Sequence, residues 1–312
     1  MAVPPGGLKQ AGVALVTALM MVALATLAAV TLASRQQIDV RRSATFLNTN
    51  QALAYADGVE AWAVRLLRRD QLDNNVDHPG EDWARELPPI LVEGGQVSGR
   101  IEDLQGRYNI NNLLTPEGRI DATELERFRR LLATLDLPLE LANAVADWLD
   151  ADLEARFPGG AEDYDYLALD PPYRAANRAM TSLSELRLVR GVDEAAWRKL
   201  ASVLTALPTP TPLNVNTASP AVLRMLDETL TAQEAAQLVE ARGDEGFATV
   251  QDFLALELLA GRNLDADALS VSSQYFLLRA DVRIGTARIP LLAVMRREEA
   301  GVRVIRHARG AL

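Results

Sequence analysis

The uncharged stretch VALVTALMMVALATLAAVTLA, residues 13–33, determines the overall organisation of this 312-residue chain. At about 1.5 Å of rise per residue, a helix over this stretch is roughly 30 Å long, which matches the hydrocarbon core of a bilayer. A cleaved secretory signal has an apolar region of only about 7–15 residues that ends at a small-residue site. This stretch is longer, and it therefore predicts a membrane helix close to the N-terminus.

The helix is predicted to continue beyond the membrane. No proline occurs between Pro5 and Pro79. After Arg35, apolar residues recur near the spacing of one helix face, which predicts an amphipathic helix. These residues are Ile38, Phe46, Leu47, Leu53, Val59, Trp62 and Leu66. We therefore expect one long rod to about Leu67, whose second half packs on a folded domain.

The charges beside the apolar stretch do not explain its orientation. Lys9 and the free amine precede it, whereas Arg35, Arg41 and Arg42 follow it. Cytoplasmic flanks normally carry the excess of Lys and Arg, so these charges oppose an arrangement with the large C-terminal part outside. If that part lies outside the cytoplasm, another determinant must set the topology.

Composition excludes several functional classes. The net charge of −10 disfavours nucleic-acid binding, because phosphate contacts need a basic face. The absence of cysteine excludes disulfides, iron–sulfur clusters and thiol catalysis. His78 and His307 lie far apart, which disfavours catalytic zinc and a Ser-His-Asp triad. Because the chain also lacks a nucleophile elbow, a phosphate-binding glycine loop and a dinucleotide fingerprint, we predict that it is not an enzyme.

Strand patterns flank a long helical stretch. The alternation and the Gly-Gly pair in PPILVEGGQVSGRIEDLQGR, residues 88–107, predict a hairpin. Strand patterns return only near Val271, as SSQYFLLRADVRI, TARIPLLAVMRRE and GVRVIRHAR. The predicted fold is α+β: a long N-terminal transmembrane helix packs on a small antiparallel sheet, and a large all-α domain is inserted between strands. The predicted segments are 13–34 for the membrane helix, 35–107 for the amphipathic helix and first strands, 108–270 for the insert and 271–312 for the last strands.

The insert contains an internal repeat. YNINNLLTPEG at Tyr108–Gly118 resembles LNVNTASPAVL at Leu213–Leu223, since each has an Asn-rich turn leading into a helix with capping residues. The following AAQLVEARGDEGFATVQDFLAL resembles a helix-hairpin-helix or SAM-like unit. Such a hairpin can bind DNA through a glycine turn, but the expected turn, Asp227–Thr231, reads DETLT and carries two carboxylates. A structural scaffold is favoured, and a membrane-anchored, competence-type DNA-binding protein is the alternative.

An acidic run lies in the middle of the insert. Eight acids and one base, Arg156, lie between residues 147 and 170. Such charges repel one another unless they are neutralised, and oxygen ligands suit calcium. The spacing is not that of an EF-hand, because Ala155 stands where its glycine belongs. We expect an irregular calcium site, with a solvated acidic loop as the alternative. The candidate ligands are Asp150, Asp152, Glu162, Asp163 and Asp165.

The N-terminal tail resembles a type IV prepilin leader. The short tail MAVPPGGLKQAG ends at Gly12 and is followed at once by the uncharged helix. This resemblance implies that residues 1–12 are a leader, that a prepilin peptidase cuts between Gly12 and Val13, and that the new N-terminus is methylated. Most such proteins have Glu at the fifth mature position, which is Thr17 here.

Segments along the whole chain are similar to the minor pseudopilin K family of type II secretion systems, which typically lacks that Glu. These segments are DLQGRYNINNL, ADWLDAD, GGAEDYDY, SLSELRLVRG and LNVNTA, and they occur in this order. A carboxyl in lipid is costly unless it neutralises the terminal amine of the subunit ahead. A subunit at the tip of a filament has none ahead, so Thr17 fits a tip position.

The resemblance implies a minor pseudopilin at the tip of a periplasmic pseudopilus that helps to initiate its assembly for export of folded proteins across the outer membrane. It implies a single-pass protein of the bacterial inner membrane with its C-terminal domain in the periplasm. Calcium is implied in the inserted domain. The implied partners are minor pseudopilins of the I and J types, the major pseudopilin, the prepilin peptidase, the inner-membrane assembly platform and membrane lipid, with no nucleic acid.

Overall fold

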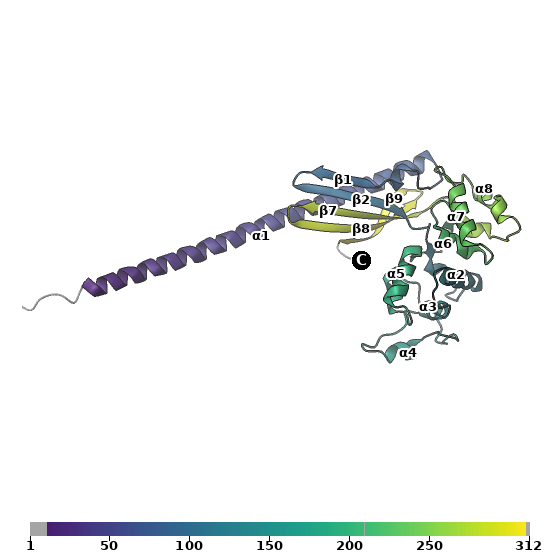
Figure 1. The fold of residues 1–312 in the computed structure, drawn as a ribbon, viewed down its shortest axis with the longest axis horizontal. Helices are drawn as coiled ribbons and strands as arrows, with labels where there is room; N and C mark the ends of the chain where they lie inside the picture. The colour runs from purple at the N-terminus through teal and green to yellow at the C-terminus, as the bar shows by residue number, and fades with distance from the viewer. Residues whose placement is uncertain (1–10, 209, 310–312) are drawn as a thin grey trace, which may run out of the picture.

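One long helix dominates the computed structural model, which describes residues 11–208 and 210–309 (Figure 1). Helix α1, Ala11–Asp73, has 63 residues and is therefore about 95 Å long. It ends six residues beyond the predicted Leu67. The side chain of Asn74 accepts a hydrogen bond from the Val76 amide at 2.8 Å, which turns the chain out of the helix.

The second half of α1 packs on a sheet. Ala52, Ala56, Ala63 and Leu67 are fully buried in a cluster with side chains of the sheet. Their spacing places them along one helix face, and three alanines allow the backbone of α1 to approach the strands closely. The first half of α1 projects away from the rest of the chain (Figure 1).

The sheet is antiparallel and joins the two ends of the folded region. Its strand order is β1-β2-β7-β8-β9. The bounds are Leu87–Val92 for β1, Gly95–Asp103 for β2, Tyr275–Ile284 for β7, Ala287–Glu298 for β8 and Gly301–Arg309 for β9. The β1–β2 hairpin turns at Gly94, whose φ of 83° favours glycine. Strand β2 pairs with β7 from Gly95 opposite Ile284 to Asp103 opposite Phe276, so the insert leaves and re-enters the sheet between neighbouring strands.

The inserted body is helical and has its own hydrophobic core. Its helices are α2 (Ala122–Thr134), α3 (Leu141–Leu149), α4 (Asp163–Leu167), α5 (Glu194–Val203), α6 (Pro220–Leu223), α7 (Ala232–Ala241) and α8 (Val250–Leu254). Short 3-10 turns connect several of them. Two small parallel pairs also occur: β3 (Tyr108–Asn109) with β4 (Leu204–Thr205), and β5 (Leu213–Asn214) with β6 (Leu269–Ser270).

The internal repeat is also a repeat of structure. Asn109 and Asn214 each accept a hydrogen bond from the amide two residues later, at 3.2 and 3.0 Å. Asn111 then bonds both backbone groups of Met180, and its counterpart Asn216 bonds both backbone groups of Phe247. In each half a buried asparagine amide therefore ties the entry turn to a later segment.

A buried polar network joins the sheet to the helical body. Asp103, at the end of β2, accepts hydrogen bonds from the hydroxyl groups of Ser273 (2.7 Å) and Thr217, and from the amide of Asn214 (3.1 Å). The Asn214 amide also donates to the backbone carbonyl of Asp77 at 3.1 Å. Because these groups come from both bodies and most are buried, separating the bodies would leave several polar atoms without partners.

Candidate functional site

The first half of α1 is an apolar surface without a partner. One window of 18 residues in it has a mean hydropathy of 2.5 and none of it is buried. Val13 and Leu19 are 64% and 61% exposed. Among the residues described, α1 is the one helix long and apolar enough to cross a membrane. Apolar area costs about 25 cal/mol per Å² in water, so this surface requires lipid or other apolar helices around it.

Polar side chains in the apolar segment are satisfied locally. The Thr17 hydroxyl donates to the carbonyls of Val13 and Ala14, at 3.1 and 3.0 Å. Thr26, Thr31 and Ser34 donate to earlier carbonyls in the same way. No hydroxyl of this group needs a partner outside the helix, so Thr17 adds little cost in an apolar environment.

Most of the predicted leader, residues 1–12, lies outside the described residues, because the structure describes the chain from Ala11 onward. Helix α1 includes Gly12 and Val13. The predicted cleavage position therefore lies in the first helical turn that the structure describes.

Three acids of the acidic run meet inside the helical body. Asp147 and Asp150 lie one turn apart at the end of α3, and Glu162 immediately precedes α4. One oxygen from each carboxylate lies within 4.8 Å of the other two. All three side chains are buried. This is an arrangement of hard oxygen donors, which suits a divalent cation such as calcium.

Arg156 neutralises only part of this charge. Its guanidinium pairs with Asp147 at 2.7 Å and with Asp150. Its backbone amide donates to the other oxygen of Asp147 at 3.0 Å. The chain between α3 and α4 thus folds back over the acids. Each carboxylate oxygen of Asp147 accepts a hydrogen bond from Arg156.

Three buried carboxylate oxygens have no hydrogen-bond partner within the described chain. They are Oδ1 of Asp150 and both oxygens of Glu162. The pKa of Glu162 is raised to about 7, chiefly by burial and in addition by the charges of Asp147 and Asp150. Burial also raises the pKa of Asp150, although Arg156 opposes that rise. Buried, unpartnered oxygens are the observation that a bound cation would explain.

The remaining predicted ligands have other partners. Asp152 is exposed and accepts a hydrogen bond from the Glu154 amide at 2.9 Å. Asp163 accepts from the Ala175 amide and pairs with Arg174, both at 3.1 Å. Asp165 pairs with Arg190 at 2.6 Å. The structure therefore brings together two of the five predicted residues, Asp150 and Glu162.

Sequence reasoning missed two members of this region as possible ligands. Asp147 was counted in the acidic run, and its spacing of three from Asp150 on a helix could have identified it. Asn177 lies near the acids, because its amide nitrogen donates to the Asp152 carbonyl at 3.5 Å. Its side-chain oxygen is buried and without a partner. No signal in the sequence distinguishes this asparagine.

A second group of acids differs in that its oxygens have donors. Asp70, Asp77 and Glu81 also lie within 4.8 Å of one another. Arg297 binds Asp70 at 2.7 Å and Asp77 at 2.9 and 3.0 Å. Glu81 accepts from the indole of Trp83 at 2.6 Å and from Asn74 at 2.9 Å. The protein supplies its own cation here, so this group is a structural junction.

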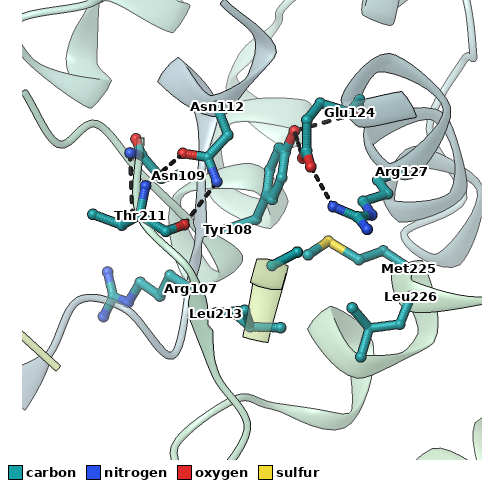
Figure 2. A pocket seen from close by; sticks show the side chains of 11 residues that line it. Arg107, Tyr108, Asn109, Asn112, Glu124, Arg127, Thr211, Leu213, Met225 and Leu226 are labelled. Atoms are coloured by element: carbon teal, nitrogen blue, oxygen red, sulfur yellow. Dashed lines mark hydrogen bonds and ion pairs between the residues drawn. The ribbon is translucent and has the colours of Figure 1, made fainter. Parts of the chain in front are cut away.

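The pocket beside Tyr108 is too small for an organic substrate. Figure 2 shows the Tyr108 hydroxyl directed at Glu124, which also pairs with Arg127, and Asn112 bound to Thr211. The cavity has a volume of about 20 Å³, which is room for one water molecule. Its polar groups bond one another, as expected for a structural cavity.

In the hairpin turn that could bind DNA, the polar groups bond other groups of the same chain. Asp227 accepts hydrogen bonds from the amide and hydroxyl groups of Thr229. Arg262 pairs with Asp227 at 3.5 Å and with Glu234 at 2.9 Å. The arginine beside this turn is thus committed to carboxylates, and the turn presents negative charge where phosphate would bind.

Comparison with protein families identifies the inserted body. The family model described as "Type II secretion system (T2SS), protein K" matches residues 106–209 and 213–272 in two parts. The boundary between these parts falls between the two halves of the structural repeat.

Individual relatives match nearly the whole chain. Type II secretion system protein K of Pseudomonas aeruginosa is 41% identical, over 94% of this chain and 90% of the relative. The proteins of the same name from Aeromonas hydrophila and Klebsiella pneumoniae are 32% and 33% identical, over 93% of this chain and 94% and 93% of the relatives.

A solved structure has the same fold. It is the GspK-GspI-GspJ complex of the type 2 secretion system of enterotoxigenic Escherichia coli, with a TM-score of 0.77 and 27% identity. The match covers 87% of this chain and 100% of that one. These comparisons give no support to the competence-type DNA-binding alternative.

Proposed function

Because the chain belongs to the type II secretion system protein K family, we propose that it is the minor pseudopilin at the tip of a periplasmic pseudopilus and helps to initiate its assembly. The family is one of structural pseudopilins and is not an enzyme family. The observation that carries the proposal is the form of α1, whose apolar first half is bare while its second half is packed on the sheet. Such a helix can leave lipid and enter a helical bundle with the same surface.

Thr17 supports the tip position. Its hydroxyl donates its hydrogen bond within α1, so it needs no hydrogen-bond partner from a subunit ahead. A glutamate at this position would need the terminal amine of such a subunit to offset its burial in lipid. Thr17 therefore adds little cost at the end of a filament, where no subunit lies ahead.

The helical body is proposed to act as a scaffold built from two related halves, the second resembling a helix-hairpin-helix or SAM-like unit. Its duplicated asparagine turns and its continuous core support this role. The role is steric: a body of this size beside the sheet would block addition of a further subunit at the tip.

The proposed partners are I-type and J-type minor pseudopilins, because the solved relative is a complex of GspK with GspI and GspJ. The major pseudopilin, the prepilin peptidase and the inner-membrane assembly platform are proposed from the prepilin-like N-terminus. The proposed location is the inner membrane, with a single pass and the C-terminal domain in the periplasm.

One experiment tests both processing and topology. The chain has no cysteine, so Leu91→Cys introduces a single thiol at a side chain that is 84% exposed. In intact spheroplasts, a membrane-impermeant maleimide should label this thiol, and the labelled protein should have the mass of a methylated chain that starts at Val13. Gly12→Val should leave residues 1–12 attached. A labelled protein that retains residues 1–12 without the substitution, or a thiol accessible only after lysis, contradicts the proposal.

Calcium is proposed as a structural ion held by Asp150 and Glu162. Asp147 and Arg156 hold Asp150 in place. The three buried oxygens without partners support this assignment. The ion would neutralise acids that repel one another and would tie the end of α3 to the start of α4.

A thermal melt of the full chain in detergent tests the calcium proposal. At a calcium concentration about 100 times the Kd, binding stabilises by about 2.7 kcal/mol, which raises the Tm by roughly 5–10 °C for a domain of this size. Glu162→Gln should abolish the shift, because Glu162 supplies two of the unpartnered oxygens. Asp170→Asn, which alters an exposed acid of the same run, should keep it. An unchanged Tm at millimolar calcium contradicts a structural site.

A further inference from the structure

We propose that the outer end of the helical body is a docking surface for a protein partner that presents cationic side chains around an apolar anchor. The surface is defined by five side chains and is called the α4 surface below. They are Leu153, Phe157, Tyr164, Leu167 and Leu169. Phe157 and Tyr164 are 96% and 88% exposed.

The exposed apolar residues are concentrated here. In the described chain beyond residue 47, ten large apolar side chains are exposed, and five of them lie between residues 153 and 169. Single exposed apolar residues are normal, whereas a group of them rimmed by polar residues marks an interaction surface. The concentration in two adjoining segments is what requires an explanation.

The two segments are fixed in place and are not loose loops. Arg156, next to Phe157, pairs with Asp147 and Asp150. The segment around α4 is held by Tyr166, whose ring packs on that of Trp148 with centroids 5.2 Å apart. The Tyr166 hydroxyl accepts a hydrogen bond from the Arg190 amide at 3.2 Å. The exposed rings therefore stand on an ordered base, which lowers the entropic cost of binding.

The charge around the α4 surface selects the partner. Asp152, Glu154 and Asp170 are exposed, and no ion pair is found for them within the described residues. The neighbouring Arg174 and Arg190 are each already paired with an acid. A second copy of this chain, an anionic lipid surface and a nucleic acid would all be repelled. Arginine or lysine side chains would pair with the free acids and stack on the exposed rings.

The position of the surface leaves it accessible in the proposed filament. Figure 1 shows α4 at the end of the helical body away from the sheet, while α1 packs against the sheet. An occupant of the α4 surface would not compete with partners that contact α1. The proposal depends on exposure and charge, and it holds whether or not calcium binds below.

Photo-crosslinking in cells tests this surface on the full chain within its own secretion system. A photoreactive amino acid is placed at position 157 or 164, with position 91, an exposed leucine of β1, as the comparison. Positions 157 and 164 should crosslink to a different protein, at a segment with Lys or Arg flanking apolar residues, as identified by mass spectrometry. No crosslink above that at position 91, or crosslinks only to a second copy or to lipid, would overturn the proposal.

A charge reversal supplies the second arm. Asp152→Lys with Glu154→Lys should lower the crosslink yield at position 157 by at least about fivefold, because two attractions become repulsions. Glu86→Lys with Glu93→Lys makes the same change in net charge on exposed residues of the β1–β2 hairpin and should leave the yield unchanged. A yield that falls equally in both variants, or in neither, would show that local charge does not select the partner.

Discussion

At the scale of single residues, the junction between sheet and helical body depends on buried charge. Asp77 is fully buried, and Arg297, which binds it, stacks on the ring of Phe276 with its guanidinium 4.7 Å from the centroid. The pKa of Asp77 is raised to about 7, chiefly by burial, while Arg297 and the Ser273 amide oppose the rise. The nearby charges of Asp103 and Asp70 contribute to the rise. Below about pH 7 the folded protein therefore holds a proton on Asp77 that the unfolded chain releases near pH 4.

This shift predicts a pH dependence of stability. Because the pKa of Asp77 is higher in the folded state than in the unfolded state, its protonation stabilises the fold. This stabilisation is fully present below about pH 4 and is lost as the pH rises through 7. The free energy of unfolding should thus increase from pH 8 to pH 5, by at most about 1.4 kcal/mol per pH unit for this one group. Asp77→Asn should reduce the slope in urea unfolding of the full chain. Part of the slope should persist, because the pKa of Asp70 is also raised by burial and by Glu81, to about 6.

The comparison of the two slopes decides whether Asp77 titrates as described. Asp281→Asn is the control. Asp281 lies on the face of the sheet opposite α1, and although burial raises its pKa, Arg283 and Arg288 lower that pKa below its usual value overall. Equal slopes between pH 5 and pH 8 for the native chain and Asp77→Asn would show that Asp77 stays ionised in the folded protein.

At the scale of elements, the contact between α1 and the sheet depends on small side chains. Ala56 is fully buried and Ala54, two residues earlier, is exposed. Ala56→Leu should destabilise the chain by about 1–3 kcal/mol, because the added atoms must displace packed neighbours. Ala54→Leu adds the same atoms on the open face and should have little effect on urea unfolding. A similar loss in both variants would mean that helix α1 does not pack as the structure has it.

The elements were largely predictable from the sequence where the pattern is local. The period of apolar residues and the absence of proline predicted α1, and alternation with Gly-Gly predicted the hairpin now seen as β1 and β2. The end of α1 was placed too early, because Asn74 and not the apolar pattern terminates it. The asparagine repeat was visible because each turn needs the same short-range bonds.

Contacts between distant residues were not predictable in the same way. Arg297 and Asp77 are far apart in sequence, and no periodicity links them. The acidic run indicated where a cation could bind, but not that Arg156 and Asp147 bind each other or that Asp163 and Asp165 pair with arginines. Which carboxylates remain without partners depends on the tertiary fold.

At the scale of the whole molecule, the chain has three parts with separate tasks. In the proposed function the bare half of α1 exchanges lipid for other helices. The sheet fixes the packed half of that helix, and the helical body adds bulk beyond it. The polar junction of Asp77, Asp103 and Arg297 couples the last two parts. The arrangement fits a subunit that ends a filament, since binding is available along α1 and steric bulk lies beside the sheet.

In the proposed function this chain forms a tip complex with I-type and J-type minor pseudopilins. The most direct measurement is the mass of the complex purified from detergent after the three proteins of one organism are produced together, with a tag on this chain alone. We predict a stable assembly with one copy of each protein, which is lost when the I-type protein or the J-type protein is replaced by the major pseudopilin. Recovery of this chain alone, or an unchanged mass when both minor pseudopilins are omitted, would contradict the account.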